Sequence, residues 1–274
     1  MRSGIINRFG IKIFVLSVLL LCFGSSYALV SPGLPPLPTG QTWQMTFNDE
    51  FNGTSLDLTK WSPGFQVPWA PGNLGNAYLN YMSVSDGILK MWPATMYPGT
   101  PAGNGYYKTS VTTYNIFEQK YGYFETRFKT TAGNGLWSGF WLLPHSLASF
   151  STDHREIDIF ENLGYQPNKI YMSLHDVTFG QYQQTYTASP DFSQGYRTLG
   201  LQWVKDSGTL IWYVDGIERA RSTLTDVPGR WNEPVYVLLD TSCMYVNWGP
   251  NCDGTTPNPA YYYVDYVRAY RVVP

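Results

Sequence analysis

Alternating apolar and polar residues recur along most of the chain and predict β-strands. The segment "KYGYFETRFKT" (120–130) alternates aromatic with polar residues, the period expected of a strand with one buried face. The segment "LGLQWVKDSGTLIWYVDGIERARS" (199–222) predicts two strands around residues 206–208 and a third strand after a tight Asp-Gly turn at 215–216. The segment "YYYVDYVRAYRVV" (261–273) predicts one more strand.

Helical patterns are scarce by comparison. Glycine and proline separate the apolar segments, and the 3.6-residue period of an amphipathic helix rarely appears. Many short antiparallel strands, each with a polar and an apolar face, predict an all-β fold of two packed antiparallel sheets, a sandwich or jelly roll. The pattern does not give the order of the strands.

The first 40 residues differ in composition from the rest. Residues 1–28 combine basic residues, an apolar run of eleven residues and a small-residue end at Ala28, as in secretory signals. That run is shorter than the ~20 residues of a membrane-spanning helix, so we expect export, extracellular or periplasmic, without stable membrane insertion. Residues 29–40 are rich in proline and glycine and predict an extended linker. Residues 41–274 then predict a single domain.

Charge and cysteine content narrow the function classes. Beyond the signal, 15 basic residues face 20 acidic ones, a net charge near −5, and no basic stretch indicates binding of nucleic acid or a heavily sulfated polymer. Cys243 and Cys252 enclose eight residues and predict a disulfide in an oxidising compartment. Two unrelated thiols are the alternative, and a zinc site lacks further cysteine or histidine ligands nearby.

One short stretch, "HREIDIFENLG" (154–164), crowds three carboxylates into an apolar run. A regular strand places Glu156 and Asp158 on one face and the isoleucines on the other. The same alternation would turn Glu161 toward the apolar side, where an unpaired carboxylate costs several kcal/mol. One extra residue, a β-bulge at 159–160, returns Glu161 to the face of the other two acids. The spacing therefore predicts a bulge.

Three aligned carboxylates suit more than one chemistry. Calcium takes clustered oxygens, but a strand presents them in a row, not as a cage. Retaining glycoside hydrolysis needs two carboxyl groups ~5–5.5 Å apart, so Glu156 and Glu161 would lean together across the bulge. Asp158 would then hydrogen-bond Glu156 and hold it in position. The plainest alternative is a solvated strand face with incidental acids.

Several stretches together resemble one enzyme family. The stretch "EIDIFE" is similar to the Glu-x-Asp-x-x-Glu signature of glycoside hydrolase family 16, the laminarinase and β-glucanase family. Further landmarks of that family match in order over nearly all of 43–272: "FNDEFNGTSLDLTKW" (47–61), "YGYFETRFK" (121–129), "GLWSGFWLLP" (135–144), "WYVDG" (212–216) and "YVDYVRAY" (263–270). The resemblance implies a jelly roll with a concave cleft and a retaining, endo-acting mechanism. It implies Glu156 as nucleophile, Glu161 as general acid/base and Asp158 as assisting acid.

Flat aromatic residues are expected beside these acids, because sugars offer apolar faces as well as hydroxyls. Trp137 and Trp141 share a strand face with the small Gly139 between them, and we expect both to wall the cleft. The resemblance implies a site role for His175 on a neighbouring strand and for Trp203.

The chain departs from the family pattern before the "VSDG" strand. Tyr81 stands where many relatives carry an asparagine, and Asn80 is the candidate substitute in substrate binding. His145 and His154 fall in predicted loops and are expected to be ordinary surface residues.

The resemblance also raises a structural calcium site. Glu50, the Gly87 carbonyl and Asp265 match positions that bind calcium in many relatives, and ordinary salt bridges or turns are the alternative. We expect no cofactor to be required for catalysis.

The sequence thus predicts an exported, monomeric endo-β-glucanase acting on β-1,3- or mixed β-1,3/1,4-glucan. Within the same family an agar-type galactan hydrolase and a transglycosylase are alternatives. From another class, a non-catalytic β-glucan-binding module is disfavoured because both glutamates are present. The expected partner is a polysaccharide, with no nucleic acid.

Overall fold

The computed structural model describes residues 33–64, 79–93, 107–178, 180–222, 231–243 and 248–274. The chain divides into two units, Met1–Ser31 and Pro32–Pro274, and everything below concerns the second. The predicted signal segment, 1–28, and residues 29–32 of the predicted linker lie outside the described residues. Among the described residues, none forms a helix with the length and apolar character to cross a membrane.

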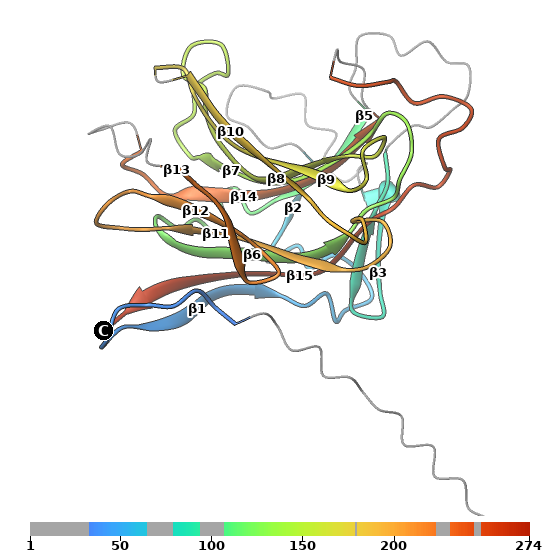
Figure 1. The fold of residues 1–274 in the computed structure, drawn as a ribbon. Helices are drawn as coiled ribbons and strands as arrows, with labels where there is room; N and C mark the ends of the chain where they lie inside the picture. Colours follow the sequence, from blue (N-terminus) through green and yellow to red (C-terminus); the bar gives the residue numbers. More distant parts are fainter. Residues whose placement is uncertain (1–32, 65–78, 94–106, 179, 223–230, 244–247) are drawn as a thin grey trace, which may run out of the picture. The chain divides into compact units, whose positions relative to one another are not determined.

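Two antiparallel sheets form the domain (Figure 1). The β6 sheet contains, in spatial order, β13 (Ile217–Ser222), β12 (Leu210–Val214), β11 (Arg197–Trp203), β6 (Gly122–Lys129), β15 (Tyr262–Val273), β4 (Ile88–Met91) and β3 (Met82–Ser85), and β1 (Thr42–Asp49) also pairs with β15. The β8 sheet contains β10 (Gly180–Thr187), β9 (Lys169–Asp176), β8 (Arg155–Leu163), β7 (Leu136–Pro144), β14 (Val235–Cys243), β5 (Tyr107–Thr112) and β2 (Ser62–Pro63). The predicted all-β, two-sheet architecture is confirmed.

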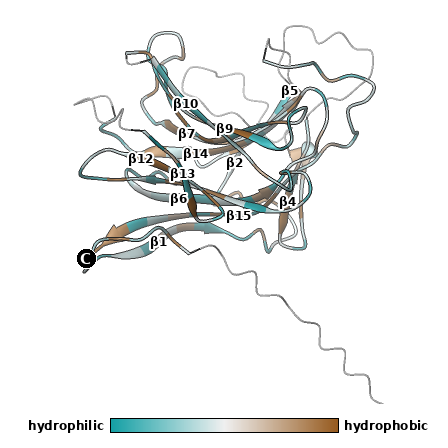
Figure 2. Ribbon diagram, viewed as in Figure 1, coloured by the Kyte–Doolittle hydropathy of each residue, from teal (hydrophilic) through white to brown (hydrophobic). Residues whose placement is uncertain are grey.

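The core lies between the two sheets. Figure 2 shows hydrophobic and hydrophilic residues alternating along the strands, as a sheet with one buried face requires. Phe128 of β6 and Phe160 of β8 meet across this core with ring centroids 3.9 Å apart, and neither is exposed. The hairpins predicted in 199–222 are present as β11, β12 and β13, with positive φ angles at Asp215 and Gly216 in the tight turn.

The predicted bulge in β8 is confirmed. Asp158 pairs with Ser173 of β9 and Glu161 pairs with Tyr171, so residues 159–160 stand opposite a single residue. Both bulge residues are fully buried in the core, while the carboxylates before and after them lie on the other face of the sheet. The extra residue thus keeps the β8 acids out of the core.

The described part of the predicted linker is extended but packs against the domain. Leu34 contacts a cluster on the β6 sheet formed by Tyr123, Ile211, Tyr213 and Tyr270. The Trp43 indole donates a hydrogen bond to the Pro35 carbonyl, with a nitrogen–oxygen distance of 2.8 Å. Leu34 and Pro35 therefore pack against the domain, whereas most of residues 36–40 are exposed.

The predicted disulfide between Cys243 and Cys252 is present, with Cα atoms 5.8 Å apart. Its second cysteine lies against Gly135, where an added Cβ would come within 2.0 Å of the Cys252 nitrogen. The disulfide therefore ties the end of β14 to the segment that precedes β7.

We predict that Phe160→Ala lowers the free energy of unfolding by ~3–5 kcal/mol, because it leaves a cavity against Phe128. Denaturant unfolding measures the change. Val177→Ala is the control, since Val177 is 49% exposed and should change stability by less than ~0.5 kcal/mol. Equal stability of the two variants would contradict the packing described for the bulge.

Candidate active site

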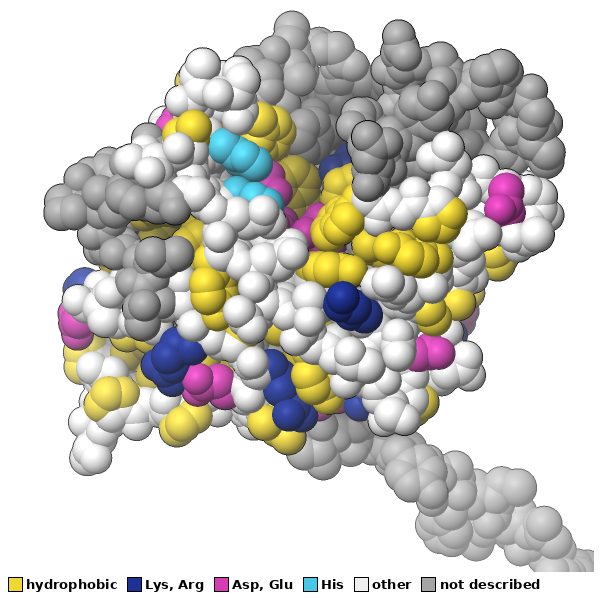
Figure 3. All heavy atoms as spheres, turned by 45° about the horizontal axis from the view of Figure 1, so that its top comes forward, with side chains coloured by type: hydrophobic (Ala, Val, Ile, Leu, Met, Phe, Trp, Pro, Cys, Tyr) yellow, Lys and Arg dark blue, Asp and Glu magenta, His cyan; other side chains and the backbone are white. Residues whose placement is uncertain are grey.

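Three carboxyl groups lie side by side on the face of β8 that points away from the core. Asp158 is 2% exposed and Glu161 8% exposed, whereas Glu156 is half-buried. Acidic and histidine side chains gather in a hollow of the surface in Figure 3. The geometry therefore joins all three acids predicted from the sequence in one partly enclosed site.

Asp158 bridges its neighbours on both sides. Burial raises the pKa of Asp158 well above its usual range, and the charge of Glu156 and a hydrogen bond between the two carboxyl groups raise this pKa further. The Nε2 atom of His175 lies 3.2 Å from Asp158 Oδ2. The raised pKa favours the protonated form of Asp158, which can donate a hydrogen bond to Glu156.

Glu161 occupies a different environment from Glu156. Burial raises the pKa of Glu161 well above its usual range, and the charges of Asp158 and Glu156 raise it further, against a smaller opposing effect of His175. Gly139 pairs with Glu161 from β7 and has no side chain to cover it. The arrangement favours the protonated form of a buried carboxyl group whose neighbour on β7 is the small Gly139.

Trp137 and Trp141, the expected cleft walls, lie on β7 next to β8, where Trp141 pairs with Asp158. An ion pair that the sequence reasoning missed lies beside them. The Nζ atom of Lys108 lies 5.3 Å from the Trp137 ring and 4.8 Å from a Trp141 ring. It pairs with Asp240, which also accepts a hydrogen bond from the Trp141 indole. A Cβ added at Gly139 would lie 3.0 Å from Asp240 Oδ1. The glycine therefore makes room for the aspartate, which holds one wall of the cleft together.

Burial and mutual attraction act in opposite directions on the pKa values of the ion pair. Burial acts to lower the pKa of Lys108, but attraction to Asp240 outweighs it and raises this pKa. Burial raises the pKa of Asp240, and Lys108 opposes that rise. Asp240 stands out in the sequence as a single acid within the apolar run "VYVLLDTSC", whereas Lys108 carries no comparable signal.

The structure also differs from the expectation for His154. The sequence predicts an ordinary surface residue, but the Nε2 atom of His154 lies 3.3 Å from Glu156 Oε2 and its ring stacks on His175. The prediction was wrong because His154 directly precedes β8 and, two positions before Glu156, continues the face that carries Glu156 and Asp158. His145 instead pairs with Glu118, and 43% of its side chain is exposed.

Two predicted substrate-binding residues lie elsewhere. Trp203 is 3% exposed and packs in the core against Tyr121 and Trp231. Strand alternation turns it inward with the leucines of β11, so the cleft role that the resemblance implied for Trp203 is not supported. Asn80 is exposed in the turn before β3, a strand of the β6 sheet, and its role in substrate binding stays a prediction.

The residues expected to hold calcium form ion pairs instead. Both Glu50 oxygens accept hydrogen bonds from Arg268, at 2.8 and 2.9 Å, and Asp265 pairs with Arg127. Gly87 has a φ of +73° and lies near the Glu50 carbonyl. With both carboxylates engaged by arginine, the salt-bridge alternative describes this region, and the calcium expectation is not supported.

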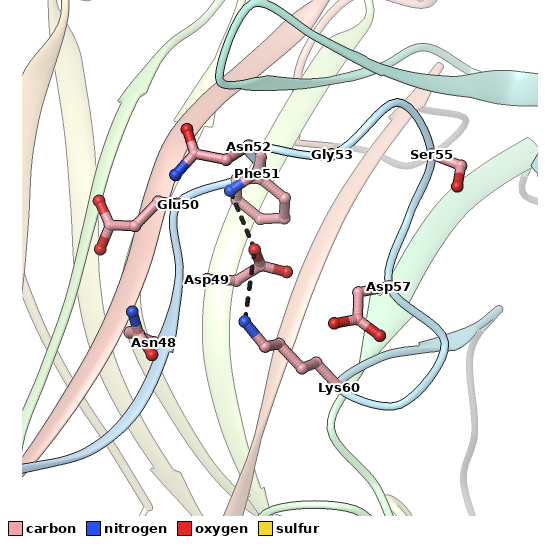
Figure 4. A pocket seen from close by; sticks show the side chains of 9 residues that line it. All are labelled: Asn48, Asp49, Glu50, Phe51, Asn52, Gly53, Ser55, Asp57 and Lys60. Atoms are coloured by element: carbon pink, nitrogen blue, oxygen red, sulfur yellow. Dashed lines mark hydrogen bonds and ion pairs between the residues drawn. The ribbon is translucent and has the colours of Figure 1, made fainter.

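The loop after β1 lines a small pocket next to these residues (Figure 4). Glu50 points away from Asp49 and Asp57 there, so the three carboxylates do not converge on one point. Asp49 accepts hydrogen bonds from the Phe51 amide and the Trp61 indole, at 2.9 and 2.8 Å. The acids of this loop serve its own structure.

Within the described part of the chain, one set of side chains has the spacing of a metal site. Atoms of Glu156, Asp158 and His175 lie within 4.8 Å of one another. The same three residues make contacts with one another in the acid and histidine cluster described above.

Comparisons with known proteins agree with this geometry. A family model described as "Beta-porphyranase A-D, GH16 domain" matches residues 43–272. The chain is 33% identical to the endo-1,3-1,4-beta-glycanase EglC of Rhizobium meliloti, over 82% of this chain and 51% of that protein. It is 28% identical to the beta-agarase AgaA of Microbulbifer thermotolerans, over 95% and 67% of the two chains. The endo-beta-1,3-glucanase of Pyrococcus furiosus superposes with a TM-score of 0.69 at 25% identity, over 86% and 97%.

The fold, the acids and the relatives together identify the family of this chain. The chain belongs to glycoside hydrolase family 16, a retaining and endo-acting family, as the resemblance implied. It spans about half the length of EglC.

Proposed function

We propose that this protein hydrolyses β-1,3- or mixed β-1,3/1,4-glucan inside the chain, with retention of anomeric configuration. The observation that carries the proposal is the β8 bulge, which puts Glu156 and Glu161 on one face in unlike environments. Glucan is favoured as substrate by EglC, which is an endo-1,3-1,4-beta-glycanase. Residues 41–274 are the proposed catalytic domain.

In the proposed mechanism, Glu156 attacks the anomeric carbon while Glu161 gives its proton to the departing glycosidic oxygen. The bond between sugar and oxygen breaks as the ester to Glu156 forms. Loss of the charge on Glu156 then makes Glu161 a stronger acid, so it stays ionised and takes a proton from the attacking water. Water releases the sugar, Glu156 regains its charge and Glu161 its proton. Asp158 keeps Glu156 oriented throughout.

A galactan is the second candidate substrate, because the matching family model describes beta-porphyranases. The charge of the cleft argues against a densely sulfated galactan. Lys108 is a cation in the tryptophan wall of the cleft. It is already paired with Asp240 and lies beside three further acids. Transfer of the sugar to another hydroxyl is possible for the same intermediate, and a purely binding role is disfavoured by the intact acid pair.

Export is part of the proposal. It is supported by the basic and apolar pattern of residues 1–28 and by the Cys243–Cys252 disulfide, a bond typical of oxidising compartments. We propose a secreted enzyme, extracellular or periplasmic, that works as a monomer on a polysaccharide.

A substrate panel tests the proposed function. We expect new reducing ends from laminarin and lichenan, and none from agarose, porphyran or carrageenan. Glu156→Ala is the matched control and should be inactive on all five. Cleavage of agarose or porphyran alone would replace glucan by galactan, and binding of laminarin without cleavage would indicate a binding module. Product analysis with excess acceptor separates hydrolysis from transfer.

The raised pKa of Glu161 predicts an alkaline limit to activity. Glu161 must be protonated to act as the acid, so kcat/KM should fall as pH rises through a pKa above the usual 4.5 of a glutamate. A dinitrophenyl glycoside has a leaving group that needs no proton. With this substrate, Glu161→Ala should form the ester to Glu156 without the alkaline fall in rate. Persistence of this fall in Glu161→Ala would assign it to another group.

A further inference from the structure

His154 contacts the proposed nucleophile, Glu156, and has no part in the mechanism above. His154 Nε2 lies 3.3 Å from Glu156 Oε2, and His175 Nε2 lies 3.2 Å from Asp158 Oδ2. The two imidazole rings are parallel within 8°, with centroids 5.1 Å apart. Each ring of this stacked pair thus touches one of the two carboxyl groups that share a hydrogen bond.

The position of His154 is fixed from several sides. The Val177 amide, just beyond β9, donates to the His154 carbonyl with a nitrogen–oxygen distance of 2.9 Å. The Phe150 ring meets the imidazole edge-on, at a centroid distance of 5.0 Å. Stacking on His175 holds the other face. The imidazole therefore cannot swing away from Glu156 without losing packing on both faces.

The chain around His154 is anchored by the next residue. Arg155 is 6% exposed and its guanidinium donates hydrogen bonds to Asp153 at 2.7 Å and Glu233 at 2.6 Å. It also donates to the Ser146 hydroxyl at 3.1 Å. These contacts join the loop before β8 to the segment before β14, so the entry into β8 is rigid where His154 leaves it.

Glu156 needs such support because 16% of its side chain is exposed, more than the 3% of Asp158. Asp158 holds the carboxylate from one side only, which leaves the group free to turn about its last bond. A second donor at Oε2 removes that freedom. A carboxylate held by two donors keeps its attacking oxygen in one direction, which saves orientational entropy at the moment of attack.

We propose that His154 is a positioning residue for the nucleophile: its Nε2–H donates to Glu156 Oε2 and, together with Asp158, fixes the carboxylate for attack. This inference rests on the proposed role of Glu156. Neither the resemblance nor the sequence pattern assigns His154 a role.

Trapping kinetics test the inference. A dinitrophenyl 2-deoxy-2-fluoro-β-laminaribioside labels the nucleophile, and its rate reports the first step alone. The corresponding agarobioside replaces it if the substrate panel selects galactan. His154→Phe keeps a ring for stacking but has no donor, and we expect labelling to slow by about 10- to 100-fold, the loss of one hydrogen bond to a charged group. The dissociation constant of the unreacted probe should change by less than about twofold.

Two further variants separate donation from packing. His154→Gln keeps an amide donor of similar reach and should label within about fivefold of the parent protein. His154→Asn is too short to reach Glu156 and should be as slow as His154→Phe. His145→Phe is the matched control, because His145 stacks on Tyr114 and pairs with Glu118, and it should label at the parent rate.

Labelling of His154→Phe at the parent rate would overturn the inference, and so would equal slowing in His154→Gln and His154→Phe. If His154→Phe does not fold, the ratio between His154→Gln and His154→Asn decides in its place. Failure of the proposed function is distinguishable, since the parent protein would then take no label and cleave no glycan.

Discussion

The alternation of side chains along β8 is the constraint on which the site depends. In a regular strand every second side chain faces the cleft. Asp158 and Glu161 are three residues apart and yet face the same side, so the alternation is interrupted between them. The core stabilises this interruption, because the side chains of both bulge residues enter the core and Phe160 stacks directly on Phe128. Packing energy therefore holds Glu161 on the same face as Glu156. Stability and chemistry rest on the same two positions, 159 and 160.

Because three acids crowd one face of β8, the structure must also reduce the electrostatic repulsion between them. Burial and mutual repulsion raise the pKa values of Asp158 and Glu161, which favours their protonated forms and so reduces the negative charge of the group. Lys108 balances Asp240 at the edge of the group and touches both tryptophans. The aromatic wall and the acid group are thus parts of one electrostatic arrangement.

Much of this follows from the sequence, and the failures have physical reasons. Period-two alternation predicts the sheets, and the same rule, applied strictly, predicts the bulge. It also places Trp203 on the inward face with its neighbouring leucines, so the cleft role came from resemblance against the local pattern. The Lys108–Asp240 pair joins strands that are distant in sequence and adjacent only after folding. The approach of His154 to Glu156 follows the same alternation, because the two residues are two positions apart, whereas the packing of its ring against His175 and Phe150 does not follow from the local pattern.

The arrangement of β8 is tested most directly by a crystal structure of the protein trapped with a fluorinated glycoside. The account predicts an ester between Glu156 and the anomeric carbon. It also predicts that the Glu161 carboxyl group lies on the same side of the sheet as this ester. Its distance to the attacking water or to the glycosidic oxygen should be ~2.6–3.2 Å. An ester on another residue, or a Glu161 side chain turned into the core beside Phe160, would contradict it.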